Sequence, residues 1–452
     1  MGLIYRLLTY AIRARQYIAK KSSACKNKYN ETNIPSLSGS MDMDMQGSAS
    51  EHADRAKQGF PEVEERLPHN VHRHDVPIVD DISSLLGKHN PLAKEADPER
   101  ECVWLLDNTA YRPVRPVLDN TPERHDPWQA EFVAAYFVKN SGKDVSKWVS
   151  NIADRLGLGP KGENREQAEH TIAKRLMPFV ETVQPSRWVN VELPNGKIEK
   201  LGPGGRNAIS SQVVRDMVKD YKDGDTMEVK AVHHGLTPYG SMLTLFAEPE
   251  GWLVVSDIDD TIKITMTASP LGILSSTFVD APTPIRGMPE LYAHIHSHLA
   301  PTWFYVSASP YNLYPFLRGF LHTYYPKGTT ILRDATWQNL SGILQSLTEG
   351  TESYKDSRIE KIQEWFPRRK LLCTGDSTQS DPEVYGDMYR KFGGEWIKAV
   401  FIRKVTGVAE MDRTEKNSDE RFEKAFRGVP KSVWRTFAEP EELYEAVNAL
   451  ER

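Results

Sequence analysis

The stretch Val254-Val255-Ser256-Asp257-Ile258-Asp259-Asp260-Thr261-Ile262-Lys263-Ile264 decides the fold of the second half of this chain. A short apolar strand runs directly into three carboxylates and a threonine, in the pattern Asp-x-Asp-x-Thr. Unpaired charge in a poorly solvated site is very costly, so acids at a strand end need a metal ion or an opposing cation. The pattern is typical of phosphoryl-transfer chemistry, although an unrelated turn or a calcium loop can also produce it.

From residue 251 onward, short apolar runs alternate with segments that are long enough for a helix. The expected strands are residues 252–256, 302–307, 329–332, 370–374 and 399–402. This alternation predicts a Rossmann-like, doubly wound parallel α/β sheet with helices on both faces. In such sheets, ligands bind at the carboxyl ends of the strands. The sequence therefore predicts a site just after these strands.

Chemically useful side chains follow the expected strands in order. Asp257 follows the first, Ser307 follows the second, and Asp376 follows the fourth, with Asp381 five residues further on. Lys355 lies at the expected start of the helix that leads into the fourth strand. A hydroxyl, a lysine and two groups of acids would then face one crevice. Phosphate-ester cleavage through an aspartyl-phosphate requires this set.

Each of these residues also has a purely structural interpretation. Ser307 could cap the next helix, and Gly375-Asp376-Ser377 could be an ordinary turn after a strand. Lys355 could be a solvated surface charge, with Lys361 as a rival within two helical turns. The joint order of the residues favours the enzymatic interpretation. For the three alternate histidines His294, His296 and His298, a half-exposed helix face is favoured over a metal site.

The order and placement of Asp257-Ile258-Asp259-Asp260-Thr261, Ser307, Lys355 and Gly375-Asp376-Ser377 with Asp381 resemble the four motifs of the haloacid-dehalogenase phosphatase superfamily. More narrowly, residues 100–410 resemble the fungal Mg-dependent phosphatidate phosphatase family associated with cortical actin patches. Further supporting stretches are Asp107-Asn108-Thr109-Ala110-Tyr111, Leu201-Gly202-Pro203-Gly204-Gly205-Arg206 and Thr378-Gln379-Ser380-Asp381-Pro382-Glu383.

The resemblance implies catalytic roles for four residues, a supporting role for Thr261, and hydrolysis of phosphatidate to diacylglycerol and phosphate. Asp257 would be the nucleophile, and Asp259 would protonate the leaving oxygen and then deprotonate the hydrolytic water. Ser307 would hydrogen-bond a phosphoryl oxygen, and Lys355 would balance the charge of phosphate and aspartate. Thr261 would fix the loop after the nucleophile.

The resemblance also implies a Mg²⁺ site. This ion prefers oxygen ligands in near-octahedral geometry, which carboxylates and a backbone carbonyl can supply. The expected ligands are Asp257, the backbone carbonyl of Asp259, Asp376 and Asp381, with Asp376 as the main distal ligand. Asp260 fits no catalytic role.

The substrate is less well defined than the chemistry. About forty residues separate Thr261 from Pro301, which leaves room for a flap but not for a large cap domain. An open crevice suits a lipid headgroup or a phosphoprotein better than a small metabolite. The apolar flap residues 271–274 and 278 could touch acyl chains, although core packing is the favoured use. A protein or small-molecule phosphatase, and an interaction protein at membranes or actin sites, remain alternatives.

Residues 1–30 are basic and contain no acid, and their apolar residues recur at roughly helical spacing. The segment could be an amphipathic helix on an anionic membrane, a frayed tail or a mitochondrial-type presequence. Met1-Gly2 is not expected to be myristoylated, because Arg6 occupies the position where Ser or Thr is needed. Residues 31–99 lack apolar periodicity and are typical of a disordered linker.

Residues 100–250 are predicted to form a β-rich domain, a sandwich with a helical insertion at 145–183. Expected strands lie at 103–106, 188–193, 227–232 and 241–246, whereas 131–138 fits a strand or a helix. Residues 251–410 would form the catalytic domain and 411–452 a C-terminal helical segment.

Composition excludes several classes of protein. A net charge of -5 and a pI near 6.3 give no reason to expect a nucleic-acid binder, and no apolar run is long enough to span a bilayer. Cys25, Cys102 and Cys373 lack disulfide or zinc spacing, which favours a reducing compartment. We expect a cytoplasmic protein, peripheral to membranes. Cortical actin patches and cytoskeletal or endocytic partners come only from the resemblance, and a Pro-x-x-Pro-rich tail that would support them is missing.

Overall fold

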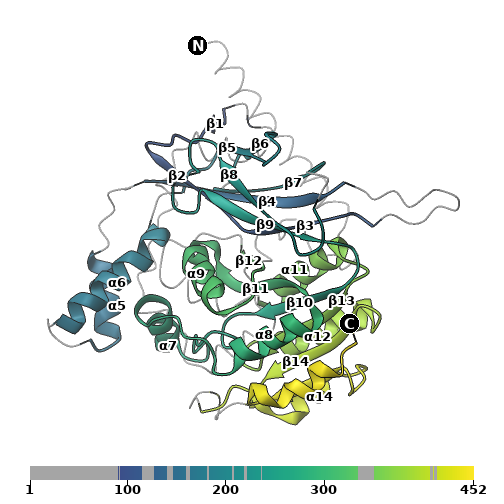
Figure 1. The fold of residues 1–452 in the computed structure, drawn as a ribbon. Coiled ribbons are helices and arrows are strands. Elements are labelled where there is room, and N and C mark those ends of the chain that lie inside the picture. The colour runs from purple at the N-terminus through teal and green to yellow at the C-terminus, as the bar shows by residue number, and fades with distance from the viewer. Residues whose placement is uncertain are drawn as a thin grey trace, which may run out of the picture. The chain divides into compact units, whose positions relative to one another are not determined.

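The computed structural model describes residues 90, 92–114, 127–139, 146–158, 163–180, 183–205, 208–217, 221–235, 237–333, 351–407, 411 and 415–451 (Figure 1). The expected basic segment at 1–30 and most of the expected linker at 31–99 lie outside these residues. Within the linker, β1 (Lys94–Glu95) pairs with a strand of the following sheet, so ordered structure begins before residue 100.

A six-stranded sheet in which all neighbouring strands are parallel occupies the second half of the described chain. In spatial order its strands are β12 (Thr329–Arg333), β11 (Thr302–Pro310), β10 (Trp252–Asp257), β13 (Lys370–Asp376), β14 (Ile397–Arg403) and β15 (Trp434–Phe437). The five strands expected from the sequence are confirmed. The strand order reverses between β10 and β13, which is the kind of switch point where such sheets bind ligands.

Helices cover both faces of this sheet, as the sequence predicted. Successive side chains of a strand point to opposite faces, and Val254 and Val255 accordingly enter two different cores. Val254 shares its core with residues of α8 (Met288–Leu299) and α9 (Tyr314–Tyr324). Val255 shares the other core with residues of α11 (Thr351–Trp365) and α12 (Asp381–Phe392). Burial on both sides explains why these strands read as continuous apolar runs.

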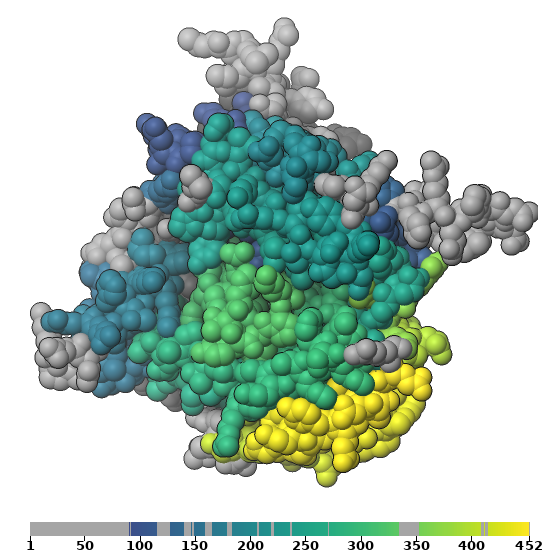
Figure 2. Space-filling view, in the orientation of Figure 1, coloured from purple at the N-terminus to yellow at the C-terminus, as the bar shows by residue number. Residues whose placement is uncertain are grey.

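The C-terminal segment is part of the sheet, which corrects the expectation that residues 411–452 are only helical. Its β15 pairs in parallel with β14, between the short helices α14 (Asp419–Ala425) and α15 (Tyr444–Asn448). The 3₁₀ turn η6 (Pro440–Leu443) joins β15 to α15. Figure 2 shows this segment in yellow on the surface, beside the green residues of the sheet and its helices.

The three histidines of α8 have separate structural partners, so the structure favours the helix-face interpretation over a metal site. His294 Nε2 lies 2.8 Å from Asn448 Oδ1, and His298 Nε2 lies 3.0 Å from the backbone oxygen of Leu450. His296 Nδ1 accepts a hydrogen bond from the Trp303 indole at 3.2 Å. Two of these contacts hold α8 against the C-terminal segment.

The strands before residue 250 form one mixed, nine-stranded sheet rather than the expected two-sheet sandwich. Besides β1 it contains β2 (Glu101–Leu105), β3 (Asn108–Tyr111), β4 (Gln129–Val138), β5 (Arg187–Glu192), β6 (Ile198–Leu201), β7 (Ile209–Val214), β8 (Thr226–Ala231) and β9 (Ser241–Ala247). The path β1-β5-β8-β9-β3-β4-β2 carries β6 on β5 and β7 on β4. The ambiguous segment 131–138 is strand, and the expected helical insertion is α5 (Ser146–Arg155) and α6 (Glu163–Val180).

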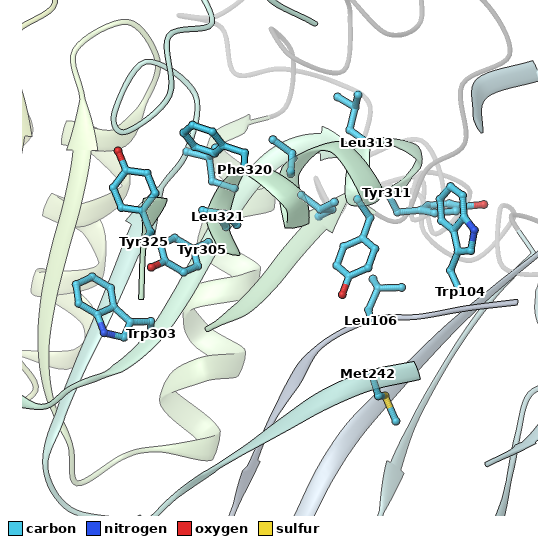
Figure 3. Packing of buried hydrophobic residues seen from close by; sticks show 14 of the residues in the cluster. Trp104, Leu106, Met242, Trp303, Tyr305, Tyr311, Leu313, Phe320, Leu321 and Tyr325 are labelled. Carbon is cyan, nitrogen blue, oxygen red and sulfur yellow. The ribbon is translucent and has the colours of Figure 1, made fainter. Parts of the chain in front are cut away.

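One hydrophobic core joins the nine-stranded sheet to one face of the parallel sheet. In Figure 3, Trp104 and Leu106 lie beside Tyr311, whereas Trp303 and Tyr305 pack with Tyr325. Among the helices that the structure describes, none combines the length and apolar character that crossing a membrane requires. The remaining short helices are α7 (Pro270–Leu274), the π-helical turn η3 (Ser275–Val279), and the 3₁₀ turns η4 (Tyr311–Leu313) and η5 (Glu415–Asn417).

A buried ion pair also fastens the two sheets together. The Asp107 carboxylate, 3% exposed, accepts two hydrogen bonds from Arg318 of α9, at 2.6 and 2.9 Å. It also accepts one from the Leu243 backbone and lies 3.2 Å from His322 Nε2. Burial raises the pKa of Asp107, but the hydrogen bonds from His322 and Arg318 outweigh it and hold this pKa below its usual value.

Candidate active site

Two carboxylates meet where β10 and β13 end side by side. Asp257 is the last residue of β10 and Asp376 the last of β13, and the two strands are hydrogen-bonded neighbours. Both side chains are buried, at 2% and 0% exposure. The Thr261 hydroxyl lies 3.0 Å from Asp257 Oδ2 and 3.2 Å from Asp376 Oδ2. Thr261 therefore links the loop after β10 to both acids.

A third carboxylate and a lysine complete this cluster. Asp381, the first residue of α12, accepts a hydrogen bond from the Asp376 backbone N–H at 3.0 Å. Gly375 makes this approach feasible, because a Cβ there would lie 2.6 Å from the Asp381 side chain. Lys355 Nζ of α11 lies 2.7 Å from Asp257 Oδ1 and also pairs with Asp381. Its rival Lys361 pairs instead with Glu131.

The negative charge of the three carboxylates in this acid cluster exceeds the positive charge of Lys355. Burial raises the pKa of Asp257 well above its usual value; Lys355 opposes this, whereas Asp381 and Asp376 add to it. Burial, together with repulsion from Asp381 and Asp260, raises the pKa of Asp376 to about 7. Burial lowers the pKa of Lys355, but Asp257 and Asp381 outweigh it, so this pKa lies above its usual value. One lysine thus faces three buried carboxylates.

The donor set of this cluster fits a hard divalent cation. Asp257, Asp376 and Asp381 each offer a carboxylate oxygen, and these atoms lie within 4.8 Å of one another. All-oxygen donor sets suit Mg²⁺ and similar ions. The side chain of Asp259 is outside this group, and its backbone carbonyl stays a predicted ligand.

Asp259 points to a separate set of hydroxyl groups. Ser307 donates a hydrogen bond to Asp259 Oδ2 at 2.6 Å, and the Ser309 hydroxyl lies 3.2 Å from the same oxygen. On the other side, Thr265 donates to Asp259 Oδ1 at 2.8 Å, and Lys263 Nζ lies 3.7 Å from that oxygen. Ser307 therefore lies at the site as expected, and its contact with a phosphoryl oxygen stays a prediction.

Sequence reasoning missed Ser309, Thr265 and Lys263. Ser309 could have been found from its spacing, because it lies two residues beyond Ser307 and alternate strand residues share a face. Thr265 and Lys263 lie in the loop after the Asp-x-Asp-x-Thr pattern, and no local signal shows that this loop folds back over Asp259.

Asp260, to which the sequence assigned no role, organises that returning loop. Its carboxylate accepts hydrogen bonds from the backbone N–H groups of Thr265, Met266 and Thr267, at 2.9, 2.8 and 2.6 Å. Asp260 itself has a φ of +60°, a left-handed conformation that aspartate tolerates better than most residues. Arg403 holds its backbone carbonyl at 2.7 Å. Asp260 therefore shapes the backbone around the site.

Comparisons with known proteins relate this part of the chain to a phosphatase family. Residues 252–404, which begin with β10 and end just after β14, match the family model described as phosphatidate phosphatase APP1, catalytic domain. The chain is 30% identical over 288 residues, 61% of its length, to phosphatidate phosphatase APP1 of Saccharomyces cerevisiae. It is 28% identical over 175 residues, 37% of its length, to an uncharacterized protein of Schizosaccharomyces pombe.

The matched regions are partial on both sides. They cover 48% of the Saccharomyces cerevisiae protein and 28% of the Schizosaccharomyces pombe protein. The matched family segment nevertheless contains all the site residues described above, from Asp257 to Asp381. Over residues 252–404, the chain is therefore similar to the phosphatidate phosphatase APP1 catalytic domain.

Proposed function

We propose that this protein is a Mg²⁺-dependent phosphatidate phosphatase of the haloacid-dehalogenase type, which hydrolyses phosphatidate to diacylglycerol and phosphate. The observation that carries the proposal is the buried group of Asp257, Asp376 and Asp381 with Lys355, at the switch point of a parallel sheet. This group lies inside the segment that matches the phosphatase catalytic domain.

The proposed reaction has two steps, which use Asp257 and Asp259 in turn. A carboxylate oxygen of Asp257 attacks phosphorus, the bond from phosphorus to the lipid oxygen breaks, and Asp259 gives its proton to that oxygen. A water molecule then attacks the phosphorus of the aspartyl-phosphate and passes a proton to Asp259. Phosphate leaves, and Asp257 is restored.

Charge stabilisation has to supply much of the rate. Enzymes that cleave phosphate monoesters lower the barrier by more than about 20 kcal/mol, and orientation contributes roughly 7–11 kcal/mol of this. In the proposal, Lys355 and the Ser307 hydroxyl stabilise the phosphoryl oxygens. A cation held by Asp257, Asp376 and Asp381 would offset the negative charge of nucleophile and phosphate; Asp381 supports the site.

The surface next to the site supports a lipid substrate. Ile264 and Met266 are each 40% exposed and flank Thr265, which donates a hydrogen bond to Asp259. Leu271, in the same flap, is 50% exposed, whereas its apolar neighbours at 273, 274 and 278 are buried in the core. These exposed apolar residues form the tip of the loop after β10. The tip would touch acyl chains while the headgroup enters the crevice.

Phosphate release from phosphatidate in mixed micelles, with Mg²⁺ or with a chelator, tests this proposal. We expect metal-dependent release that is lost in Asp257→Asn and in Asp259→Asn. The control is Glu395→Gln, which changes a fully exposed carboxylate and should retain full activity. Cleavage of phosphoproteins or small esters but not of phosphatidate would transfer the proposal to the rival phosphatases, and no cleavage at all would favour an interaction protein.

The resemblance further suggests a peripheral membrane location with a place in cortical actin patches. Imaging of the tagged protein beside an actin-patch marker tests this location. A diffuse or mitochondrial signal would contradict it.

A further inference from the structure

Lys263 is a buried cation to which the proposed reaction assigns no role. It is 1% exposed, although a buried ammonium group is costly unless it has partners. Its Nζ donates to the Thr265 hydroxyl at 2.5 Å and to the Ile264 carbonyl at 3.3 Å, and lies 3.7 Å from Asp259 Oδ1. These partners aim the lysine at Asp259 rather than at the acid cluster around Asp257.

The hydrogen bonds between these groups have a defined direction. A lysine ammonium can only donate, so the Thr265 oxygen accepts from Lys263 and its own hydrogen is free for Asp259 Oδ1, 2.8 Å away. Thr265 is itself fixed by its backbone, because its N–H donates to Asp260 and its carbonyl accepts from the Ser276 hydroxyl at 2.7 Å. The chain of hydrogen bonds from Lys263 through Thr265 to Asp259 is therefore fixed in position.

The two oxygens of Asp259 consequently have different surroundings. Oδ1 receives Thr265 and lies near Lys263, whereas Oδ2 receives Ser307 and Ser309 from the end of β11. Only the Oδ2 side adjoins Ser307, the hydroxyl expected to meet the substrate phosphoryl group.

We propose that Lys263 and Thr265 are positioning residues, which hold Asp259 Oδ1 and thereby direct Asp259 Oδ2 at the leaving oxygen. This inference rests on the proposed function, because it presupposes that Asp259 is the general acid. The loop that Asp260 holds in place would thus contribute to proton transfer.

The inference has a specific kinetic consequence. A diacylglycerol oxygen is a poor leaving group that needs a proton as it departs, whereas 4-nitrophenolate leaves readily without one. General acid catalysis contributes about 10²–10⁴-fold where it is needed. Loss of the positioning pair should therefore slow the first step, formation of the aspartyl-phosphate, far more with phosphatidate than with 4-nitrophenyl phosphate.

The test compares both substrates in Lys263→Met, Thr265→Val and Thr265→Ser. In single-turnover experiments, we expect Lys263→Met and Thr265→Val to slow the release of diacylglycerol from phosphatidate by about 10–100-fold, and the release of the first equivalent of 4-nitrophenol by less than about threefold. Thr265→Ser keeps the hydroxyl and should keep activity on both substrates. Lys361→Met, the same change at a lysine that pairs with Glu131, is the matched control.

The outcomes separate this inference from the proposed function. The aryl ester reports whether each variant is folded and able to form the aspartyl-phosphate. If the native protein cleaves both substrates and the variants lose equally on both, or lose nothing, the positioning role is wrong and the proposed function stands. If the native protein cleaves neither substrate, the proposed function fails and the inference fails with it.

Discussion

At the scale of single residues, the site depends on side chains that lie very close to neighbouring backbone. Asp376 and Asp381 come together because Gly375, the residue before Asp376 in β13, has no side chain. Asp260 gathers three backbone N–H groups and so fixes where Thr265 lies. Neither residue needs to touch substrate, yet Gly375 sets the position of Asp381, a proposed metal ligand, and Asp260 sets that of Thr265, a proposed positioning residue.

We predict that Gly375→Ala abolishes most activity. The added methyl group would lie 2.6 Å from Asp381 and must displace it, and misplacing a catalytic or ligand group by about 1 Å can cost roughly 100-fold in rate. The measurement is phosphate release from phosphatidate as a function of Mg²⁺ concentration. Gly319→Ala on α9, where an added Cβ meets nothing within 4 Å, is the matched control and should behave like the native protein. Equal activity of the two variants would contradict this account of Gly375.

At the scale of elements, two parts of the structure have separate tasks. One is the contact between α9 and the nine-stranded sheet at Asp107 and Arg318, called the joint below. The other is the loop after β10. In the joint, Asp107 of the turn between β2 and β3 pairs with Arg318. Neither residue belongs to the acid cluster. The loop carries Thr265 on its inner side and the exposed Ile264 and Met266 on its outer side. We therefore expect changes in the joint to affect stability and changes on the outer side of the loop to affect substrate access.

The joint should make stability depend on pH. The pKa of Asp107 in the folded protein lies below its usual value, so its contribution is fully present above the unfolded-state pKa near 4 and is lost as pH falls through the lower folded value. The difference in unfolding free energy between native protein and Asp107→Asn should therefore shrink below about pH 4.

Removing the partner cation gives a second measure of the same joint. Arg318→Ala removes the arginine and its two hydrogen bonds from a buried carboxylate and should cost about 3 kcal/mol at pH 7. Arg368→Ala, whose pair with Glu250 is exposed, should cost less than about 1 kcal/mol. Denaturant unfolding measures both, and equal costs would show that the joint adds no stability.

The exposed tip of the loop should matter only at a lipid surface. Burying a leucine or methionine side chain contributes about 1.5–3 kcal/mol, so the double change Met266→Ser and Leu271→Ser should lower activity on phosphatidate vesicles by at least about tenfold. Activity on soluble 4-nitrophenyl phosphate should not change. The control replaces Ile198 and Val213, 51% and 41% exposed on the other sheet, with serine. Equal losses in the two double variants would argue against a lipid-facing tip.

At the scale of the whole molecule, the sequence predicts what is local better than what depends on pairing. Strands β10 to β14 follow from their apolar runs, but β15 is four residues long and lies among helical signals, so the local sequence does not predict it. The segment of β4 is a continuous apolar run that fits a helix as well as a strand. One nine-stranded sheet and a two-sheet sandwich have the same local pattern, because strand partners are not encoded within a strand.

The candidate site divides in the same way. Asp257, Ser307, Lys355, Asp376 and Asp381 follow from the motifs and from strand ends, and the structure brings them to one edge of the sheet. The support around Asp259 does not follow from the sequence, since it depends on a left-handed Asp260 and a loop that folds back.

Trapping the phosphorylated enzyme tests the central claim most directly. In Asp259→Asn the first step should still proceed with 4-nitrophenyl phosphate and Mg²⁺, because this leaving group needs no proton, whereas hydrolysis of the intermediate should stall without its base. We predict release of one equivalent of 4-nitrophenol, and mass spectrometry after acid quenching should find one phosphoryl group on Asp257. Asp257→Asn should give neither signal. A phosphoryl group on another residue, or continued turnover by Asp257→Asn, would contradict the account.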